Sequence, residues 1–272
     1  MTDLIEVKGI AKAFGGIKAL NGCSFTVQKG DIHGLIGPNG SGKTTLFNVM
    51  TGYERPDAGS VNFNGKEITG QSPGKIFRMG IGRTFQLTRV FSRLSVLDNM
   101  LIAAQHQHKW FKSALRSPGQ GGERQRALDL LDFVGIARLA ELEAGSLSYG
   151  QRKLLELAYL LMADPDVLFL DEPAGGVNPT LINQLTERIR ELNAAGKTIL
   201  VVEHNMEFVM GLCDRITVMH QGVALLTDLP ATVRSDPRVL DAYLGGVEEE
   251  AEGGDPDSMA DATFTQADRS ES

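Results

Sequence analysis

Long apolar runs and alternating runs mark the predicted strands of this chain. An almost unbroken apolar run is typical of a strand that is buried on both faces of a parallel sheet. Three such runs occur, at residues 31–36, 167–171 and 198–204. Alternating or paired runs predict further strands at residues 4–10, 23–27, 60–68, 214–219 and 222–226. Within one of these runs, Asn64-Gly65 predicts the turn of a β-hairpin.

The middle of the chain shows helical spacing instead. Ser95 is placed to cap the start of one helix. Ser148 and Gln151 form a capping-box pattern before a strongly apolar helix at residues 153–162. The polar and basic segment 106–126 contains a Pro-Gly-Gln-Gly-Gly run and is predicted to be a loop. Further helices are predicted at residues 127–134 and 180–193.

Strand, helix and strand alternate outside this middle segment, which predicts an α/β fold with a mainly parallel sheet covered by helices. The alternating strands add a small antiparallel sheet at its side. We expect one domain over residues 1–246, with a core at 1–89 and 164–246 and an inserted helical subdomain at about 90–163. Residues 247–272 carry nine acidic residues and one basic residue, so we expect an acidic, disordered tail.

The stretch Gly37–Thr45 fits G-x-x-x-x-G-K-[ST], a loop whose backbone N–H groups surround nucleotide phosphates. A predicted strand enters the loop and a predicted helix leaves it, which is the context that this loop requires. Lys43 would reach the β- and γ-phosphates, and the Thr44 hydroxyl would face Mg²⁺. We therefore predict that the nucleotide is bound by Asn39, Gly40, Ser41, Gly42, Lys43, Thr44 and Thr45.

Two acidic residues and a histidine stand at the ends of predicted buried strands. Asp171 closes one strand, where a carboxylate can hold Mg²⁺ directly or through water. Glu172 follows at once, and a second carboxylate beside a metal ligand suits the polarisation of an attacking water. His204 ends another strand, where a hydrogen bond to the γ-phosphate is one interpretation and a structural role is the other.

The stretch Leu147–Gln151 offers a serine hydroxyl, a glycine N–H and a helix N-terminus, so it is a second candidate phosphate site. Taken alone, an ordinary capped helix is the better interpretation. In chain order, however, these stretches resemble the motifs of the ATP-binding-cassette (ABC) ATPase family over roughly residues 4–246. The motifs are Walker A at Gly37–Thr45, the Q-loop glutamine Gln86, the signature Leu147–Gln151, Walker B at Val167–Asp171 with Glu172, the D-loop region Gly175–Pro179, and the switch histidine His204.

The resemblance implies a P-loop (RecA-like) fold and a head-to-tail dimer that encloses two ATP molecules. Ser148, Gly150 and Gln151 of one subunit would contact the ATP that the other subunit holds. In that other subunit, Lys43 would grip the phosphates and Phe14 would stack on the adenine ring. Each ATP site would therefore be built from two subunits.

The resemblance also assigns catalytic roles. Glu172 would be the general base, His204 would sense the γ-phosphate, and Gln86, which means little by itself, would sense the transmembrane partner. The Mg²⁺ ligands would be Thr44, Gln86 and Asp171. Two motifs depart from the family pattern, because Tyr149 replaces a common glycine of the signature and Val177-Asn178 replaces the usual Leu-Asp of the D-loop. Neither departure removes a catalytic group.

Finer features resemble the ATP-binding subunits of branched-chain amino-acid importers. They are residues 83–86, 89–91, 95–99, the basic insert after Gln105, and residues 175–179 and 242–245. The implied partners are membrane permease subunits, a second ABC ATPase subunit of the same or similar kind and, indirectly, a solute-binding protein outside the membrane. Urea and short-chain amide importers have close relatives of this subunit, so those cargoes stay open.

Composition narrows the location and the partners. Outside the tail the chain carries 25 acidic and 26 basic residues, which gives no electrostatic case for nucleic acid. No apolar run approaches the ~20 residues of a membrane span, and the first residues lack the plan of a signal peptide. Cys23 and Cys213 form no disulfide or metal pattern. We expect a peripheral protein on the cytoplasmic face of the membrane.

Two other classes of function fit less well. A soluble ABC ATPase that acts on nucleic acid or ribosomes usually carries two cassettes, a long coiled coil or a strongly basic arm, and the sequence has none of these. A GTPase or a small-molecule kinase would lack the signature stretch. The guanine-reading Asn-Lys-x-Asp sequence is also missing.

Overall fold

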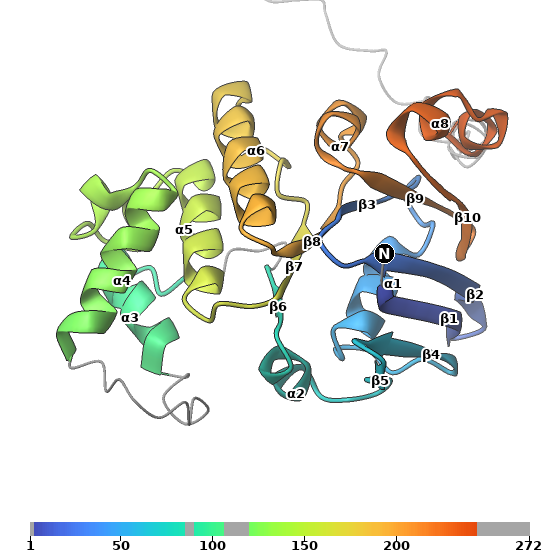
Figure 1. Cartoon of the computed structure of the whole chain (residues 1–272), viewed down its shortest axis with the longest axis horizontal. Coiled ribbons are helices and arrows are strands. Elements are labelled where there is room, and N and C mark those ends of the chain that lie inside the picture. The colour runs from blue at the N-terminus through green and yellow to red at the C-terminus, as the bar shows by residue number, and fades with distance from the viewer. Residues whose placement is uncertain (1–2, 85–89, 106–119, 244–272) are drawn as a thin grey trace, which may run out of the picture.

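The computed structural model describes residues 3–84, 90–105 and 120–243, which form two sheets with helices around them (Figure 1). The larger sheet contains β3 (Ile32–Ile36), β6 (Ile81–Arg83), β7 (Val167–Asp171), β8 (Thr198–Val202), β9 (Arg215–His220) and β10 (Val223–Asp228). Its strand order is β10-β9-β3-β8-β7-β6. The strands from β9 to β6 run parallel, and β10 runs antiparallel to β9. The prediction of a mainly parallel sheet is therefore confirmed.

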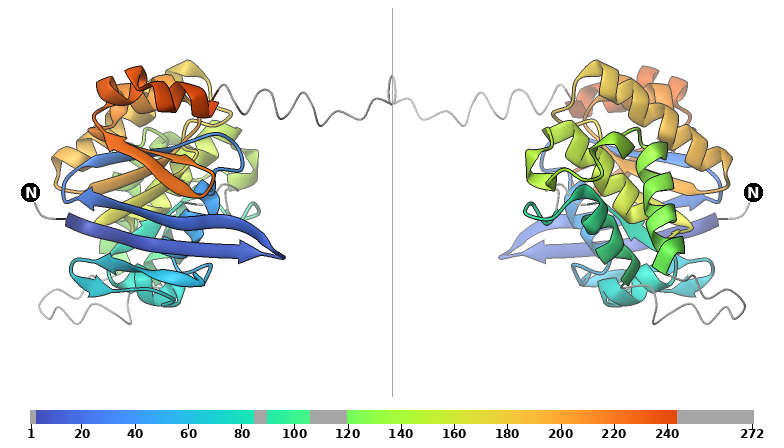
Figure 2. Two further views of the ribbon diagram at one scale, coloured as in Figure 1. Left: turned by 90° about the vertical axis from the view of Figure 1, so that its right-hand side faces the viewer. Right: turned by 90° about the vertical axis from the view of Figure 1, so that its left-hand side faces the viewer.

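The smaller sheet is antiparallel, as predicted, and has the order β2-β1-β4-β5. Its strands are β1 (Asp3–Phe14), β2 (Ile17–Gln28), β4 (Ala58–Phe63) and β5 (Lys66–Glu67). Gly15 and Gly16 both have positive φ angles and join β1 to β2 in a tight hairpin, which Figure 2 shows as a long ribbon across its left view. The predicted Asn64-Gly65 turn joins β4 to β5 with the same signs of φ.

Eight α-helices lie among the described residues. They are α1 (Lys43–Met50), α2 (Pro73–Arg78), α3 (Val96–Gln105), α4 (Gln120–Phe133), α5 (Tyr149–Leu161), α6 (Pro179–Ala194), α7 (Met206–Leu212) and α8 (Pro230–Ser235). Helices α3, α4 and α5 contact one another at one end of the large sheet (Figure 1). No helix in the described parts of the chain is both long and apolar enough to cross a bilayer.

The central strands bury side chains on both faces, which explains their unbroken apolar runs. In β7, Leu168 and Leu170 pack into the core shared with α3 to α8. Val167 and Phe169 point the opposite way, into a second core shared with α1 and the antiparallel sheet. Asp171 continues this alternation, so its carboxylate is directed toward the side of the sheet that carries α1.

The predicted loop over residues 106–126 is wrong at its end, because α4 begins at Gln120. Gly121 and Gly122 fall in the first turn of this helix, and Glu123 in the same turn interacts favourably with the helix dipole. Residues 106–119 lie outside the described part of the chain. The predicted helix start at Ser95 is confirmed, because the Ser95 hydroxyl accepts a hydrogen bond from the Asp98 N–H at 2.9 Å.

Candidate nucleotide site

The loop between β3 and α1 leaves the start of α1 open. Gly42 precedes the helix with φ 98° and ψ 4°, a left-handed conformation, and no side chain caps the helix. A Cβ atom at Gly42 would also collide with the Ala19 carbonyl oxygen, so only glycine fits there. The first N–H groups of a helix lack intrahelical acceptors, and here they are available to an anion. Of the predicted binding residues on this segment, Asn39, Gly40 and Thr44 are exposed, Gly42, Lys43 and Thr45 are partly buried, and Ser41 is buried.

Lys43 folds back over this loop. Its Nζ atom donates hydrogen bonds to the carbonyl oxygens of Gly37 and Pro38, at 2.7 Å and 2.9 Å. Burial lowers the pKa of the Lys43 ammonium, and the charge of the Glu172 carboxylate works in the opposite direction. The structure therefore brings the loop lysine and Glu172 into the same electrostatic environment.

Asp171 ends β7 and is almost fully buried. Its Oδ2 atom lies 3.1 Å from a guanidinium nitrogen of Arg83, the last residue of β6. The same guanidinium donates to Asn48 Oδ1 at 2.7 Å and Thr51 Oγ1 at 2.8 Å, so it connects α1 to Asp171. Burial raises the pKa of the Asp171 carboxyl, and the Arg83 cation opposes that rise.

Glu172 and His204 stand on two neighbouring strand ends. Glu172 has φ 46°, a left-handed conformation that is uncommon for a residue with a side chain. Its N–H donates to the Val202 carbonyl oxygen of β8 at 2.9 Å. His204 Nδ1 lies 3.9 Å from Glu172 Oε1, and the His204 side chain is 62% exposed. The structure thus places the two side chains together at the surface of the site.

The predicted capping box at the start of α5 is confirmed. Ser148 Oγ accepts a hydrogen bond from the Gln151 N–H at 3.3 Å, and Gln151 Oε1 accepts one from the Ser148 N–H at 2.9 Å. A cavity of about 640 Å³ opens beside this helix start, and Ser148, Gly150 and Gln151 line it. Its remaining lining comes from residues 135–136, 138–139, 149, 154, 176–178, 180–181 and 184, so the described residues of the phosphate loop do not reach this cavity.

Two other predicted site residues are less constrained. Phe14 lies at the end of β1 and is 47% exposed, with the Lys12 ammonium 5.2 Å from the centre of its ring. Its ring is therefore accessible to a ligand. Gln86 lies outside the described residues, as does the rest of the segment 85–89.

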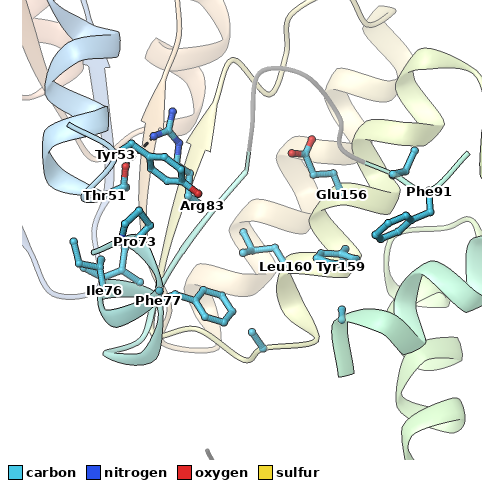
Figure 3. A pocket seen from close by; sticks show the side chains of 15 residues that line it. Thr51, Tyr53, Pro73, Ile76, Phe77, Arg83, Phe91, Glu156, Tyr159 and Leu160 are labelled. Carbon is cyan, nitrogen blue, oxygen red and sulfur yellow. Dashed lines mark hydrogen bonds between the residues drawn. The ribbon is translucent and has the colours of Figure 1, made fainter. Parts of the chain in front are cut away.

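An apolar cavity of about 480 Å³ lies between α2 and α5 (Figure 3). Ile76 and Phe77 of α2 line one side, and Tyr159 and Leu160 of α5 line the other. Arg83 also lines it, so the residue that holds Asp171 is a wall of this cavity as well. We call this cavity the α2–α5 groove. The pattern of the sequence did not predict it.

Three charged side chains near the site were missing from the sequence-based prediction: Arg83, Lys153 and Glu203. Each is largely buried in the structure. A sign of two of these buried charges was present in the sequence. Lys153 is a charged residue in a helix predicted to be strongly apolar, and Glu203 is a charged residue at the end of an apolar strand. Charged residues are seldom buried without partners, but the contacts that tie these three to the site cross 88, 19 and 29 positions of the sequence, so spacing alone does not reveal them.

Comparisons with protein families give two matches. A family described as ABC transporter matches residues 20–175. A second, described as branched-chain amino acid ATP-binding cassette transporter, matches residues 227–249.

Known relatives cover nearly the whole chain. The high-affinity branched-chain amino acid transport ATP-binding protein LivG of Salmonella typhimurium is 40% identical, over 89% of this chain and 98% of the relative. The corresponding protein BraF of Pseudomonas aeruginosa is 38% identical with the same coverage.

Solved structures agree with this picture. A crystal structure of a nucleotide-free ATP-binding cassette from an ABC transporter has TM-score 0.79 and 35% identity, over 89% of this chain and 99% of that one. A crystal structure of the ADP conformation of an ABC transporter cassette has TM-score 0.80 and 35% identity, over 90% and 100%.

Proposed function

This chain belongs to the ABC transporter family as an ATP-binding cassette, an ATPase coupled to transport, and we propose that it drives the import of branched-chain amino acids. The relatives that cover most of the chain carry names of branched-chain amino acid transport ATP-binding proteins. The match at residues 227–249 supports the same cargo from a separate part of the chain. Urea and short-chain amides are the alternative cargoes.

One observation carries the ATPase mechanism: the phosphate loop, Asp171, Glu172 and His204 meet at one edge of the large sheet. The strands β3, β8 and β7 are parallel neighbours. Asp171 is the last residue of β7, and the phosphate loop, Glu172 and His204 follow the carboxyl ends of these strands. Ligands of open α/β sheets bind at this edge. Lys43 binds the phosphates, Glu172 takes a proton from the attacking water, and His204 donates a hydrogen bond to the γ-phosphate.

The residues present fit Mg²⁺ as the metal of this site. Mg²⁺ is usually held by one or two protein oxygens together with substrate phosphates and water. Among the described residues, no three His, Cys, Asp or Glu side chains gather into a metal site of their own. Thr44 and Asp171 would supply a hydroxyl and a carboxylate oxygen, and Gln86 a third oxygen. The ion would neutralise phosphate charge when it is bound with ATP.

A second cassette completes the site. The signature residues Ser148 and Gly150 line their own cavity, which the described residues of the phosphate loop do not enter. Two subunits arranged head to tail bring the signature of each to the ATP of the other. Hydrolysis then depends on closure of the dimer, whether the second cassette is identical or only similar.

The α2–α5 groove is the docking surface that we propose for a permease on the cytoplasmic face of the membrane. Phe77, Phe91 and Tyr53 are exposed large apolar or aromatic side chains that line it. The groove also borders the chain on either side of Gln86, since Arg83 and Val90 both line it. A permease helix that binds in the groove would contact Arg83, and a shift of Arg83 would in turn change its ion pair with Asp171. A solute-binding protein outside the membrane delivers the cargo to the permease.

Glu172→Gln tests the mechanism most directly. The variant keeps a polar side chain of the same size but cannot accept a proton at neutral pH, so we expect a loss of turnover of at least roughly a hundredfold. ATP binding should be retained, and the variant should accumulate as an ATP-bound dimer in size-exclusion chromatography. Hydrolysis at the rate of the unsubstituted protein would remove Glu172 as the base.

The trapped Glu172→Gln dimer also tests the transport role. Affinity capture of this variant from detergent-solubilised membranes with ATP should recover two permease subunits. Proteoliposomes with these permeases and the unsubstituted ATPase should take up radiolabelled leucine, isoleucine and valine. Uptake of urea or acetamide instead would reassign the cargo, and recovery of ribosomes or nucleic acid in place of permeases would contradict a transport role.

A further inference from the structure

The catalytic carboxylate stands on a tight turn immediately after β7. The turn comprises residues 172–175, and it is closed by a hydrogen bond from the Gly175 N–H to the Glu172 carbonyl oxygen at 3.1 Å. We call it the Glu172 turn. Glu172 itself has a positive φ of 46°, a strained conformation for a residue with a side chain, which persists only where the surroundings hold it. The contacts that hold this turn therefore decide where the Glu172 carboxylate points.

One of these contacts comes from the signature helix α5. The Lys153 ammonium donates a hydrogen bond to the Glu172 carbonyl oxygen at 2.6 Å. Lys153 is only 8% exposed and lies one helical turn beyond the capped start at Ser148. Its ammonium also lies 5.6 Å from the centre of the Tyr149 ring. A buried ammonium is costly, and Lys153 directs its charge at the backbone of the catalytic turn.

Another contact comes from the residue that precedes His204. Glu203 is fully buried, and its Oε1 atom accepts a hydrogen bond from the Ala174 N–H in the Glu172 turn at 2.6 Å. Its Oε2 atom accepts hydrogen bonds from the N–H groups of His204 and Asn205, at 3.1 Å and 3.3 Å. One carboxylate therefore joins the Glu172 turn to the backbone of His204.

We propose that Lys153 and Glu203 are positioning residues that hold the Glu172 turn from two sides. Lys153 ties the catalytic carboxylate to the signature helix of its own subunit, and Glu203 ties it to His204. A movement of α5 when a second cassette closes on the signature is then transmitted to Glu172 through Lys153. This inference rests on the proposed role of Glu172 as the general base.

Small displacements matter at such a site, because an error of about 1 Å in the position of a reacting group can cost on the order of a hundredfold in rate. Lys153 is buried beside Leu154, a residue of the apolar core, so methionine, which is unbranched and of similar length, would fill the volume of its stem. If Lys153 served only to pack α5, the Lys153→Met variant would be as active as the unsubstituted protein. A lower activity of this variant would therefore show that the ammonium positions the Glu172 turn.

Lys153→Met is the first variant, and Lys197→Met is its matched control. Lys197 also makes a 2.6 Å hydrogen bond, with Asp164, but has no contact with the Glu172 turn. We expect Lys153→Met to lower kcat roughly tenfold to a hundredfold with little change in KM or in equilibrium ATP affinity. Lys153→Arg, which keeps a donor, should restore part of kcat. Equal kcat in both methionine variants, or a loss that appears only in KM, would overturn the proposal.

A double-mutant cycle shows whether Lys153 acts through Glu172. In the Glu172→Gln background, slow single-turnover hydrolysis should be the same with lysine or methionine at position 153, because no base remains to be positioned. If Lys153→Met lowers hydrolysis by the same factor in both backgrounds, Lys153 acts elsewhere and the proposal fails. If Glu172→Gln alone leaves hydrolysis intact, the proposed role of Glu172 fails instead, so the two failures are distinct.

Glu203→Gln gives a readout that does not depend on activity. Hydrogen exchange of the peptide that contains the Ala174 N–H should become faster in this variant, since a neutral amide is a weaker acceptor than a carboxylate. The kcat should fall while ATP affinity stays unchanged. Unaltered exchange together with unaltered kcat would remove Glu203 from the proposal. If Lys153→Met does not fold, Lys153→Arg and Glu203→Gln still decide the question.

Discussion

The two helix starts that we propose as phosphate sites, those of α1 and α5, differ in how their first N–H groups are satisfied. At α1 the preceding residue is Gly42, which has no side chain to offer, and the helix start is left uncapped. At α5 the preceding residue is Ser148, which exchanges two hydrogen bonds with Gln151 in a complete capping box. The first start is open to phosphate in a single subunit, whereas at the second the capping box already satisfies the N–H groups of Ser148 and Gln151.

This difference fits the order of events in a two-subunit site. We propose that a single cassette binds ATP at α1, because no side chain caps the first N–H groups of this helix and a phosphate can accept hydrogen bonds from them. At α5 the Ser148 hydroxyl is already engaged by the Gln151 N–H, and we propose that Ser148 gains a hydrogen bond to a phosphate only after the partner subunit has presented its ATP. We infer that the start of α1 determines the affinity of a single subunit for ATP, and that the start of α5 determines whether two subunits close into a dimer around ATP.

The largest expected effect follows from Lys43→Ala, at the open helix start. Hydrogen bonds to charged groups are worth about 1.5–3 kcal/mol, so ATP affinity of the single subunit should fall roughly tenfold to a hundredfold. Titration with a fluorescent ATP analogue measures this. Lys29→Ala removes the same charge from an exposed position and is the control. Tight binding by Lys43→Ala would show that α1 does not set the affinity.

Substitution of Ser148 should change the ATP affinity of a single subunit less than Lys43→Ala does, but it should strongly impair formation of the dimer. Ser148→Asp keeps a good helix cap and adds a negative charge that repels the partner's phosphates. Affinity of the single subunit for ATP should stay within about twofold, while ATP-driven dimer formation in the Glu172→Gln background should be lost. Ser148→Arg should block closure by bulk.

Ser146→Asp, two residues earlier and outside the cavity of the signature, is the control for Ser148→Asp. It should form the dimer normally. If Ser148→Asp and Ser148→Arg both close around ATP as well as Ser146→Asp does, then the contrast between α1 and α5 has no functional meaning.

Structural features that a few adjacent residues specify could be predicted from the sequence. The phosphate loop, the Ser148 capping box and the Asn64-Gly65 turn are each specified by a few adjacent residues, and each is present. The buried strands β3, β7 and β8 were predicted because burial on both faces leaves an unbroken apolar run. Local chemistry and burial pattern therefore specify most of the fold.

Contacts between distant residues could not be predicted from one sequence. The Arg83 side chain meets Asp171 across 88 positions, and Lys153 meets the Glu172 carbonyl group across 19. Such pairs depend on how helices and strands pack, which periodicity does not encode. Short helices such as α2 and α7 were missed for a related reason: one or two turns carry too few residues to show a period.

The smallest expected effect concerns the cap itself. Gln151→Ala removes the acceptor of the Ser148 N–H, so the free energy of unfolding of the single subunit should fall by about 0.5–1 kcal/mol. Urea unfolding followed by circular dichroism measures this change. Gln125→Ala, on the exposed surface of α4, replaces the same residue type outside any cap and should change stability less. A loss at Gln151 no larger than at Gln125 would mean that α5 does not rely on its capping box, and the contrast with α1 would then rest on Ser148 alone.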